Sequence, residues 1–255
     1  MEHWNHRDTS KVRERRSYFE HTETDSVELY MKAITKNILM IFLLITTLGV
    51  VSCGGDGDNN SELPLPTPTG NNREIEGFGK VADAIDLGLS VKWANWNLGA
   101  LRIDDYGGLY GAGDPTGQKK SSSPSDYYFK DSESICGTTY DIASVKWGKP
   151  WRLPTYYELK ELKDKCTWTY DVLIGNVLGC KATGPNGNTI FIPYSGHRIE
   201  STIYEREKHA SIWSGEMGVA YHPNGYWDLD INKGGGFQMD GSDNYIGQSV
   251  RPVCE

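Results

Sequence analysis

The residues of this chain best suited to chemistry are the histidines and cysteines that follow residue 53. No two of these cysteines form a CxxC pair, which is the usual spacing of a structural zinc site. HExxH, GxSxG and phosphate-loop motifs are also absent from the sequence, and these motifs mark metalloproteases, hydrolases and nucleotide-binding enzymes. We therefore predict no catalytic residues, no metal site and no cofactor. The residues in question are His197, His209, His222, Cys136, Cys166, Cys180 and Cys254.

A fifth cysteine, Cys53, ends an apolar run that begins at Ile38 and follows two lysines. About 14 apolar residues give a helix of roughly 21 Å, which is short for a membrane core of ~30 Å. A basic segment followed by a short apolar run is typical of a secretory signal peptide. The last four residues, VVSC, resemble the lipobox of bacterial lipoproteins. That resemblance implies cleavage before Cys53 and acylation of its sulfur and new amino group, and several acyl chains anchor a protein stably.

The organisation of the whole chain follows from this signal. The signal has normal proportions only if it starts at Met31. We interpret residues 1–30 as an upstream start or a disordered extension, and residues 31–52 as the lipoprotein signal peptide. Residues 53–77 contain many Gly, Pro, Asn and acidic residues and read as a flexible tether. Residues 78–255 have the usual size of one domain.

The charge distribution argues against nucleic acid as a partner. The net charge is -8, while residues 1–52 hold seven basic and seven acidic residues. The excess of acid therefore lies after residue 52, and an acidic domain repels phosphate backbones. The acidic residues after Cys53 also resemble the signal that sends lipoproteins of the Bacteroides group to the outer face of the outer membrane. We expect a surface-exposed outer-membrane lipoprotein.

Local patterns in residues 78–255 predict one helix and several strands. Thr155 and Glu158 have the spacing of a capping box, and apolar residues follow on one helical face. Asn186-Gly187 predicts a hairpin turn between CKATG and TIFIP. Alternating apolar residues predict a strand over residues 87–93, and shorter strands are expected at residues 211–213, 226–231 and 249–253. We expect an α+β domain with short antiparallel strands, one or two helices and long loops.

Two further sets of residues are candidates for binding and for covalent structure. Exposed aromatic residues beside acidic ones can stack on sugar rings and hydrogen-bond to hydroxyl groups. The candidate ligand-binding residues are Tyr221, His222, Asn224, Tyr226 and Asp228. An even number of cysteines in an exported domain favours two disulfides, although their spacing leaves both the pairing and a free-thiol state open.

Six stretches of the chain resemble the Fibrobacter succinogenes major paralogous domain, which is common in lipoproteins of the Bacteroides group. They are AIDLGLSVKWANWNLGA, YGGLYGAGDPTG, WGKPWRLPTYYELKEL, TGPNGNTIFIP, IWSGE and IGQSVRPVC. The resemblance covers about residues 82–255. Its motif residues are expected to be structural, with tryptophans in the core and arginines joining loop carbonyls or carboxylates. These motif residues are Trp147, Gly148, Trp151, Arg152, Pro154, Thr155, Glu158, Arg251 and Pro252.

The resemblance implies a C-type-lectin-like fold in which the first and last strands of the domain meet. It also implies a disulfide from the helix to the last strand, Cys166 to Cys254, which leaves Cys136 to Cys180. The EPN, QPD and WND motifs of calcium-dependent lectins are absent, so sugar binding through calcium is not implied.

The function we expect is non-enzymatic. A lipid-anchored envelope protein would present a binding or adhesion module for a glycan or a surface protein. One alternative is an enzyme on a related fold such as that of the formylglycine-generating sulfatase activators, which use cysteines. Another is a structural subunit of a surface or fimbrial assembly.

Overall fold

The computed structural model describes residues 73–130, 134–218 and 223–255. By internal contacts the chain divides into two units, Met1–Leu63 and Pro64–Glu255, and every described residue belongs to the second. The predicted signal peptide, Cys53, Tyr221 and His222 lie outside the described residues. No helix in the described part of the chain is long and apolar enough to cross a membrane.

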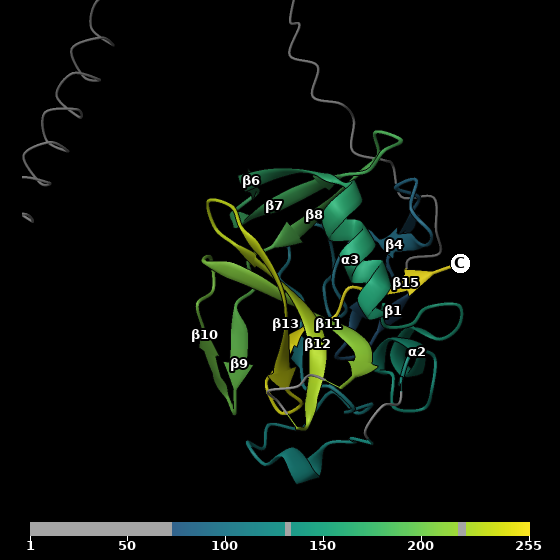
Figure 1. The fold of residues 1–255 in the computed structure, drawn as a ribbon, viewed down its shortest axis with the longest axis vertical. Helices are drawn as coiled ribbons and strands as arrows, with labels where there is room; N and C mark the ends of the chain where they lie inside the picture. The colour runs from purple at the N-terminus through teal and green to yellow at the C-terminus, as the bar shows by residue number, and fades with distance from the viewer. Residues whose placement is uncertain (1–72, 131–133, 219–222) are drawn as a thin grey trace, which may run out of the picture. The chain divides into compact units, whose positions relative to one another are not determined.

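Strands dominate the described residues. They are 39% strand and 11% helical, so the expected α+β, C-type-lectin-like class is wrong and the domain is mostly β (Figure 1). The elements are β1 (Glu74–Ile75), β2 (Gly79–Lys80), β3 (Ala84–Ile85), β4 (Lys92–Ala94), β5 (Leu109–Tyr110), η1 (Pro124–Asp126), α2 (Ile142–Trp147), α3 (Tyr156–Lys165), β6 (Thr167–Ile174), β7 (Val177–Thr183), β8 (Thr189–Pro193), β9 (His197–Ile199), β10 (Thr202–Tyr204), β11 (His209–Met217), β12 (Gly225–Asn232), β13 (Phe237–Asp243), β14 (Gln248–Ser249) and β15 (Val253–Cys254).

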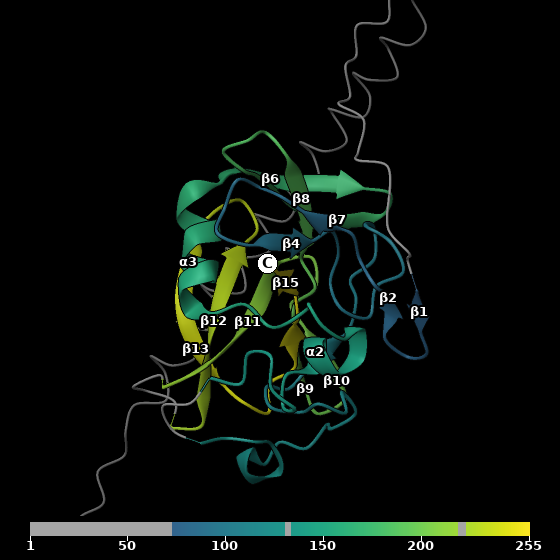
Figure 2. The ribbon, with the colours of Figure 1, turned by 90° about the vertical axis from the view of Figure 1, so that its right-hand side faces the viewer.

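The strands form several small sheets around one larger sheet. The larger sheet has the order β13-β12-β11-β14-β5, and two three-stranded sheets have the orders β15-β4-β3 and β6-β7-β8. Two hairpins, β1-β2 and β9-β10, complete the set. Strand β15, near the end of the chain, pairs with β4 through Val253 and Trp93. Figure 2 shows β15 beside β4 in the view turned by 90°.

Helix α3 forms where the capping signal predicted it. Thr155 accepts a hydrogen bond from the Glu158 amide, and the Glu158 carboxylate accepts one from the Thr155 amide. This reciprocal pair satisfies two amides that lack helical partners. Leu159 and Leu162 are fully buried on the face of the helix that packs against the larger sheet. The capping-box prediction is confirmed.

The predicted β-hairpin at Asn186-Gly187 is also confirmed, whereas the predicted strand over residues 87–93 is wrong. Strands β7 and β8 pair antiparallel around the turn, and Gly187 has the positive φ of 86° that this turn needs. Only the end of the 87–93 segment is a strand, β4, because Gly88 turns the chain at a φ of 74°. The segment still alternates in burial, since Leu87, Val91 and Trp93 are buried.

Two clusters of buried side chains lie on opposite sides of β11. Trp213 belongs to the first cluster, which also contains Trp96, Trp147 and Trp151. Its neighbour Ile212 belongs to the second cluster, with Trp93 and Leu159. Successive side chains of a strand point to opposite faces, so β11 separates the two cores.

The four cysteines of the described residues are free, and the two expected disulfides are not present. Cys166 and Cys180 lie in the second core cluster, whereas Cys254 lies in the first and Cys136 packs against it. Each expected pair would therefore join thiols from different clusters. The Cys136 thiol instead donates to the Pro154 carbonyl at 3.6 Å.

Candidate ligand-binding site

The surface of helix α3 combines exposed aromatic side chains with an open groove. The groove has a volume of about 360 Å³. Tyr157, in the first turn of α3, lines it and is 75% exposed, more than any other exposed large apolar or aromatic side chain in the part of the chain that the structure describes. The other lining residues are Ser90, Glu158, Lys160, Glu161, Asp164 and Lys165.

Helical spacing explains why Tyr157 faces solvent. Leu159 is buried and lies two residues further along α3, or roughly 200° around the helix. The side chain of Tyr157 therefore points away from the core. The exposure of Tyr157 could have been predicted from the sequence, because the capping box and the leucines of α3 define which face of the helix is buried.

Two further aromatic rings extend this surface beyond the groove. The Tyr156 ring lies 5.3 Å from that of Tyr157 and 4.9 Å from that of Trp227, between ring centroids. Tyr156 belongs to α3 and Trp227 to β12, and both are partly exposed. We call Tyr156, Tyr157 and Trp227 the aromatic surface.

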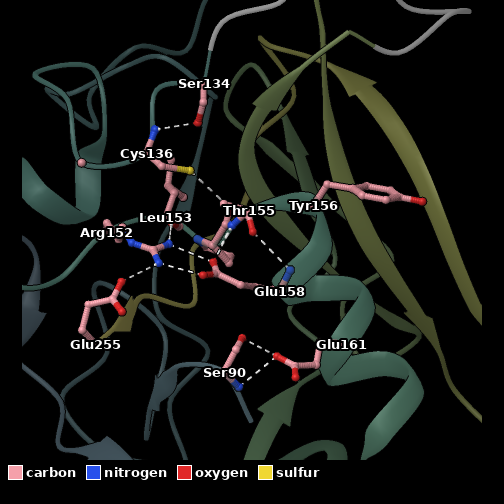
Figure 3. Close-up of polar contacts among 12 residues, drawn as sticks. Ser90, Ser134, Cys136, Arg152, Leu153, Thr155, Tyr156, Glu158, Glu161 and Glu255 are labelled. Carbon is pink, nitrogen blue, oxygen red and sulfur yellow. Dashed lines mark hydrogen bonds and ion pairs between the residues drawn. The ribbon is translucent and has the colours of Figure 1, made fainter.

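The start of α3 is held rigidly under this surface. Arg152 donates two hydrogen bonds to the Glu158 carboxylate, at 2.8 and 2.7 Å, and forms an ion pair with Glu255 at 3.2 Å. Burial disfavours the charge on Glu158, but the hydrogen bonds from Arg152 and Thr155 outweigh it and lower the pKa of this carboxyl. Figure 3 shows Tyr156 directed away from this ion-paired cluster.

Most charged side chains that line the groove form ion pairs with one another. Lys165 pairs with Glu161 at 2.7 Å, and Lys160 pairs with Asp164. Glu161 also accepts hydrogen bonds from the amide and hydroxyl of Ser90 (Figure 3). Because Glu158 is neutralised by Arg152, the lining is polar but close to neutral.

Of the ligand-binding residues predicted from the sequence, the structure describes Asn224, Tyr226 and Asp228, and these three do not form an exposed surface. Tyr226 and Asp228 are fully buried, and the Tyr226 hydroxyl donates to the Tyr128 carbonyl at 2.8 Å. Asp228 accepts a hydrogen bond from Gln248 at 2.7 Å. Asn224 is partly buried, and its carbonyl accepts a hydrogen bond from the Asn244 amide. The side of β12 that carries Tyr226 and Asp228 is thus covered, so these two side chains cannot contact a sugar.

The motif residues from the family resemblance lie in structural positions. Trp147 and Trp151 are buried edge to face with ring centroids 5.4 Å apart, and Gly148 caps α2 at a φ of 80°. The carbonyls of Pro154 and Pro252 accept hydrogen bonds from the amides of Gly215 and Ala94.

Arg251 has no exposed surface, and it joins three segments of the chain. Its guanidinium donates to the Asn97 side chain at 2.9 Å and to the carbonyls of Ala94 and Phe191 at 3.0 and 2.7 Å. All three acceptors are neutral oxygens. Burial lowers the pKa of Arg251 to about 9, so it stays charged at neutral pH.

One group of side chains among the described residues could hold a metal ion, although the sequence predicted none. His197, Glu205 and His209 place one ligand atom each within 4.8 Å of one another. Their spacing in the sequence matches no metal-binding motif, so no local pattern could have identified them.

Comparisons of the chain with protein-family models, with curated proteins and with solved structures found no match. The family resemblance over residues 82–255 accordingly stays a prediction.

Proposed function

We propose that this chain is a lipid-anchored protein of the bacterial outer membrane whose folded domain binds a glycan at the aromatic surface, without catalysis. The observation that carries the proposal is the exposed Tyr157 ring beside the groove along α3. The anchor rests on the lipobox-like sequence at Cys53, and the family resemblance to Bacteroides-group lipoproteins supports the same location.

The aromatic surface suits the apolar face of a sugar ring. Binding sites combine aromatic side chains with a few polar groups that fix orientation, and partly exposed aromatic rings supply rigid contact area. The rings of Tyr156 and Trp227 pack against each other with centroids 4.9 Å apart, which restricts their movement before a ligand arrives. The contact area is therefore available at a small entropic cost.

The groove beside the aromatic surface favours a neutral, polyhydroxylated ligand. Its carboxylates and ammonium groups are already paired, as in Lys165–Glu161 and Lys160–Asp164. Paired charges still accept and donate hydrogen bonds to hydroxyl groups, but they exert little net attraction on a phosphate or a free cation. The paired charges of the groove therefore favour an uncharged glycan over nucleic acid.

The rival interpretation, a cysteine-dependent enzyme, needs a thiolate, because the thiolate is the reactive form. Burial raises the pKa of Cys136 to about 12, of Cys180 to about 12 and of Cys166 to about 11. It raises the pKa of Cys254 as well. At neutral pH these four thiols are protonated, which favours the binding function.

Replacing Tyr157 with alanine should weaken glycan binding by about 5-fold, because a lost aromatic stack costs on the order of 1 kcal/mol. A glycan array probed with the purified full chain would identify a bound sugar. Titration of that sugar, followed by tryptophan fluorescence, would then measure the affinity of each variant.

The matched control is Tyr140→Ala, because Tyr140 is also an exposed tyrosine but does not line the groove. We expect its affinity to equal that of the wild type. Equal affinities for the wild type and Tyr157→Ala, or no binding to any glycan on the array, would contradict the proposal.

Replacing Cys53 with alanine should abolish lipid attachment. In cells labelled with radioactive palmitate, the wild-type chain should carry label, and inhibition of the lipoprotein signal peptidase should leave the precursor uncleaved. The matched variant Cys136→Ala should keep the label. Label that persists in Cys53→Ala would rule out the anchor.

A further inference from the structure

The hairpin β9-β10 and the start of β11 bring two histidines and a glutamate together. The Nδ1 atom of His209 lies 3.4 Å from the Glu205 carboxylate, and the ring centroids of His197 and His209 are 5.3 Å apart. In both ribbon views this hairpin lies away from α3 (Figures 1 and 2). This cluster, which we call the His-Glu-His cluster, is therefore separate from the groove.

The backbone around Gly196 places these three side chains. Gly196 bridges to Ala210 of β11, and its amide donates to the His209 carbonyl at 2.8 Å, which sets His197 beside His209. Gly196 has a φ of 68°, and a Cβ atom there would lie 2.0 Å from the Tyr204 carbonyl oxygen. Only glycine allows this close approach of the turn that carries Glu205.

Glu205 is also held in an uncommon backbone conformation, with a φ of 53°. The Lys208 amide donates to its carbonyl at 3.1 Å, so the chain turns back on itself between Glu205 and His209. This tight turn brings the Glu205 carboxylate to His209 across four residues. A residue other than glycine at positive φ is unusual and worth a functional explanation.

The electrostatics of the cluster favour a cation. The Asp230 side chain lies close enough to His197 and His209 for the charges of these groups to interact, and it accepts a hydrogen bond from Ser211. A neutral imidazole is the form that binds a metal ion, and each histidine offers one ring nitrogen to the cluster. Arg206, the cationic residue that follows Glu205 in the chain, places its guanidinium over the Tyr106 ring, 4.5 Å from the ring centroid.

We propose that His197, Glu205 and His209 bind a divalent transition-metal ion, Zn²⁺ or a close analogue, with an open coordination position. Two imidazoles and one carboxylate are a donor set that zinc accepts at about 2.0–2.2 Å, with water as the fourth ligand. Donor atoms around one such ion lie roughly 3.4 Å apart, so the present spacing must close by about 1.4 Å at most. The Glu205 side chain is 55% exposed and can make that movement.

The test is a zinc titration of the purified full chain, freed of metal beforehand and read against a chromophoric chelator. We expect one ion per chain in this cluster, and a Co²⁺-substituted sample should show the visible absorption of a four-coordinate site. His197→Ala and His209→Ala should each weaken zinc binding at least about 100-fold, and Glu205→Gln about 10-fold.

Glu207→Gln is the matched control for Glu205→Gln. Its carboxylate accepts a hydrogen bond from the Tyr106 hydroxyl at 3.2 Å and lies outside the cluster. We expect this variant to bind zinc as the wild type does. Because His209 is mostly buried and its loss could disturb folding, the exposed Glu205→Gln variant keeps the test valid, with thermal melting in chelator as the check on folding.

Absence of zinc binding at micromolar concentrations would overturn the proposal, and so would equal binding by wild type and Glu205→Gln. The zinc proposal is independent of glycan binding. Glycan titrations carried out in chelator should match those with zinc present, so failure of one proposal can be told from failure of the other.

Discussion

Replacement of Arg251 with methionine is expected to lower the free energy of unfolding by on the order of 3 kcal/mol, enough to depress Tm by roughly 6–12 °C. Arg251 has no exposed surface and donates three hydrogen bonds, to Asn97, Ala94 and Phe191. Methionine fills much of the volume but removes the guanidinium hydrogen bonds to three buried oxygens. Each such loss costs about 1–3 kcal/mol, offset in part because a buried charge is removed.

Arg251→Lys separates the charge from the geometry of the guanidinium. Lysine keeps the positive charge, but its ammonium group cannot reach three divergent acceptors as the planar guanidinium does. We expect about half the destabilisation of the methionine variant. Urea unfolding of the full chain, followed by tryptophan fluorescence, measures the free energy of unfolding of both Arg251 variants.

The control for these variants is Arg102→Met, because the Arg102 side chain is 74% exposed. Its stability should change by less than about 0.5 kcal/mol. If Arg251→Met unfolds at the same urea concentration as Arg102→Met, the three hydrogen bonds do not hold the domain together.

Replacement of Asp228 with asparagine is expected to stabilise the domain at pH 8 by ~2 kcal/mol. Asp228 is fully buried, and its Oδ1 atom has no hydrogen-bond partner, while Oδ2 accepts from Gln248. Burial, and then the negative charge of Asp230, raise the pKa of Asp228 to about 7. Asparagine removes the buried charge and keeps an oxygen for Gln248.

The same shift sets the sign of the pH dependence. Between the ordinary carboxyl pKa of about 4 and the raised value in the folded state, the folded chain binds more protons than the unfolded chain. Asp228 therefore contributes a fall in stability as pH rises from about 4 to 7, and no further change above that. Asp228→Asn should lose this contribution.

Urea titrations at a series of pH values, in chelator so that metal ions do not contribute, would measure the difference between the two proteins. The exposed residue Asp126 provides the control, Asp126→Asn, which should follow the wild-type profile. A stability difference between wild type and Asp228→Asn that is the same at pH 4 and pH 8 would contradict this account.

Elements with local signals were predictable from the sequence. The capping box at Thr155 and the Asn186-Gly187 turn each specify a backbone conformation within a few residues, and both formed as predicted. Strands of two residues, such as β5 and β14, carry no such signal, and the two strands pair with each other although more than 100 residues separate them. Helix α3 could be predicted from the sequence, whereas many of the short strands could not. The amount of β structure was therefore underestimated, which led to the wrong α+β class.

Burial was harder to predict than periodicity. The alternation along β12 correctly predicted a strand, but both of its faces carry buried residues. The burial of Asp228 depends on β14 and on Gln248, which covers Asp228 from a distant part of the sequence. The His-Glu-His cluster has the same origin, since Gly196 and its bridge to Ala210, not a sequence motif, bring the two histidines together.

The pairing of β4 with β15 has a consequence for how the chain matures. Trp93 meets its partner Val253 only after 160 further residues have been added, and the Arg251 bonds to Asn97 and Ala94 wait for the same segment. Such long-range contacts slow folding and leave apolar surface uncovered meanwhile. A chain still emerging from the ribosome therefore cannot complete this core, so the domain closes only when residues 251–254 arrive.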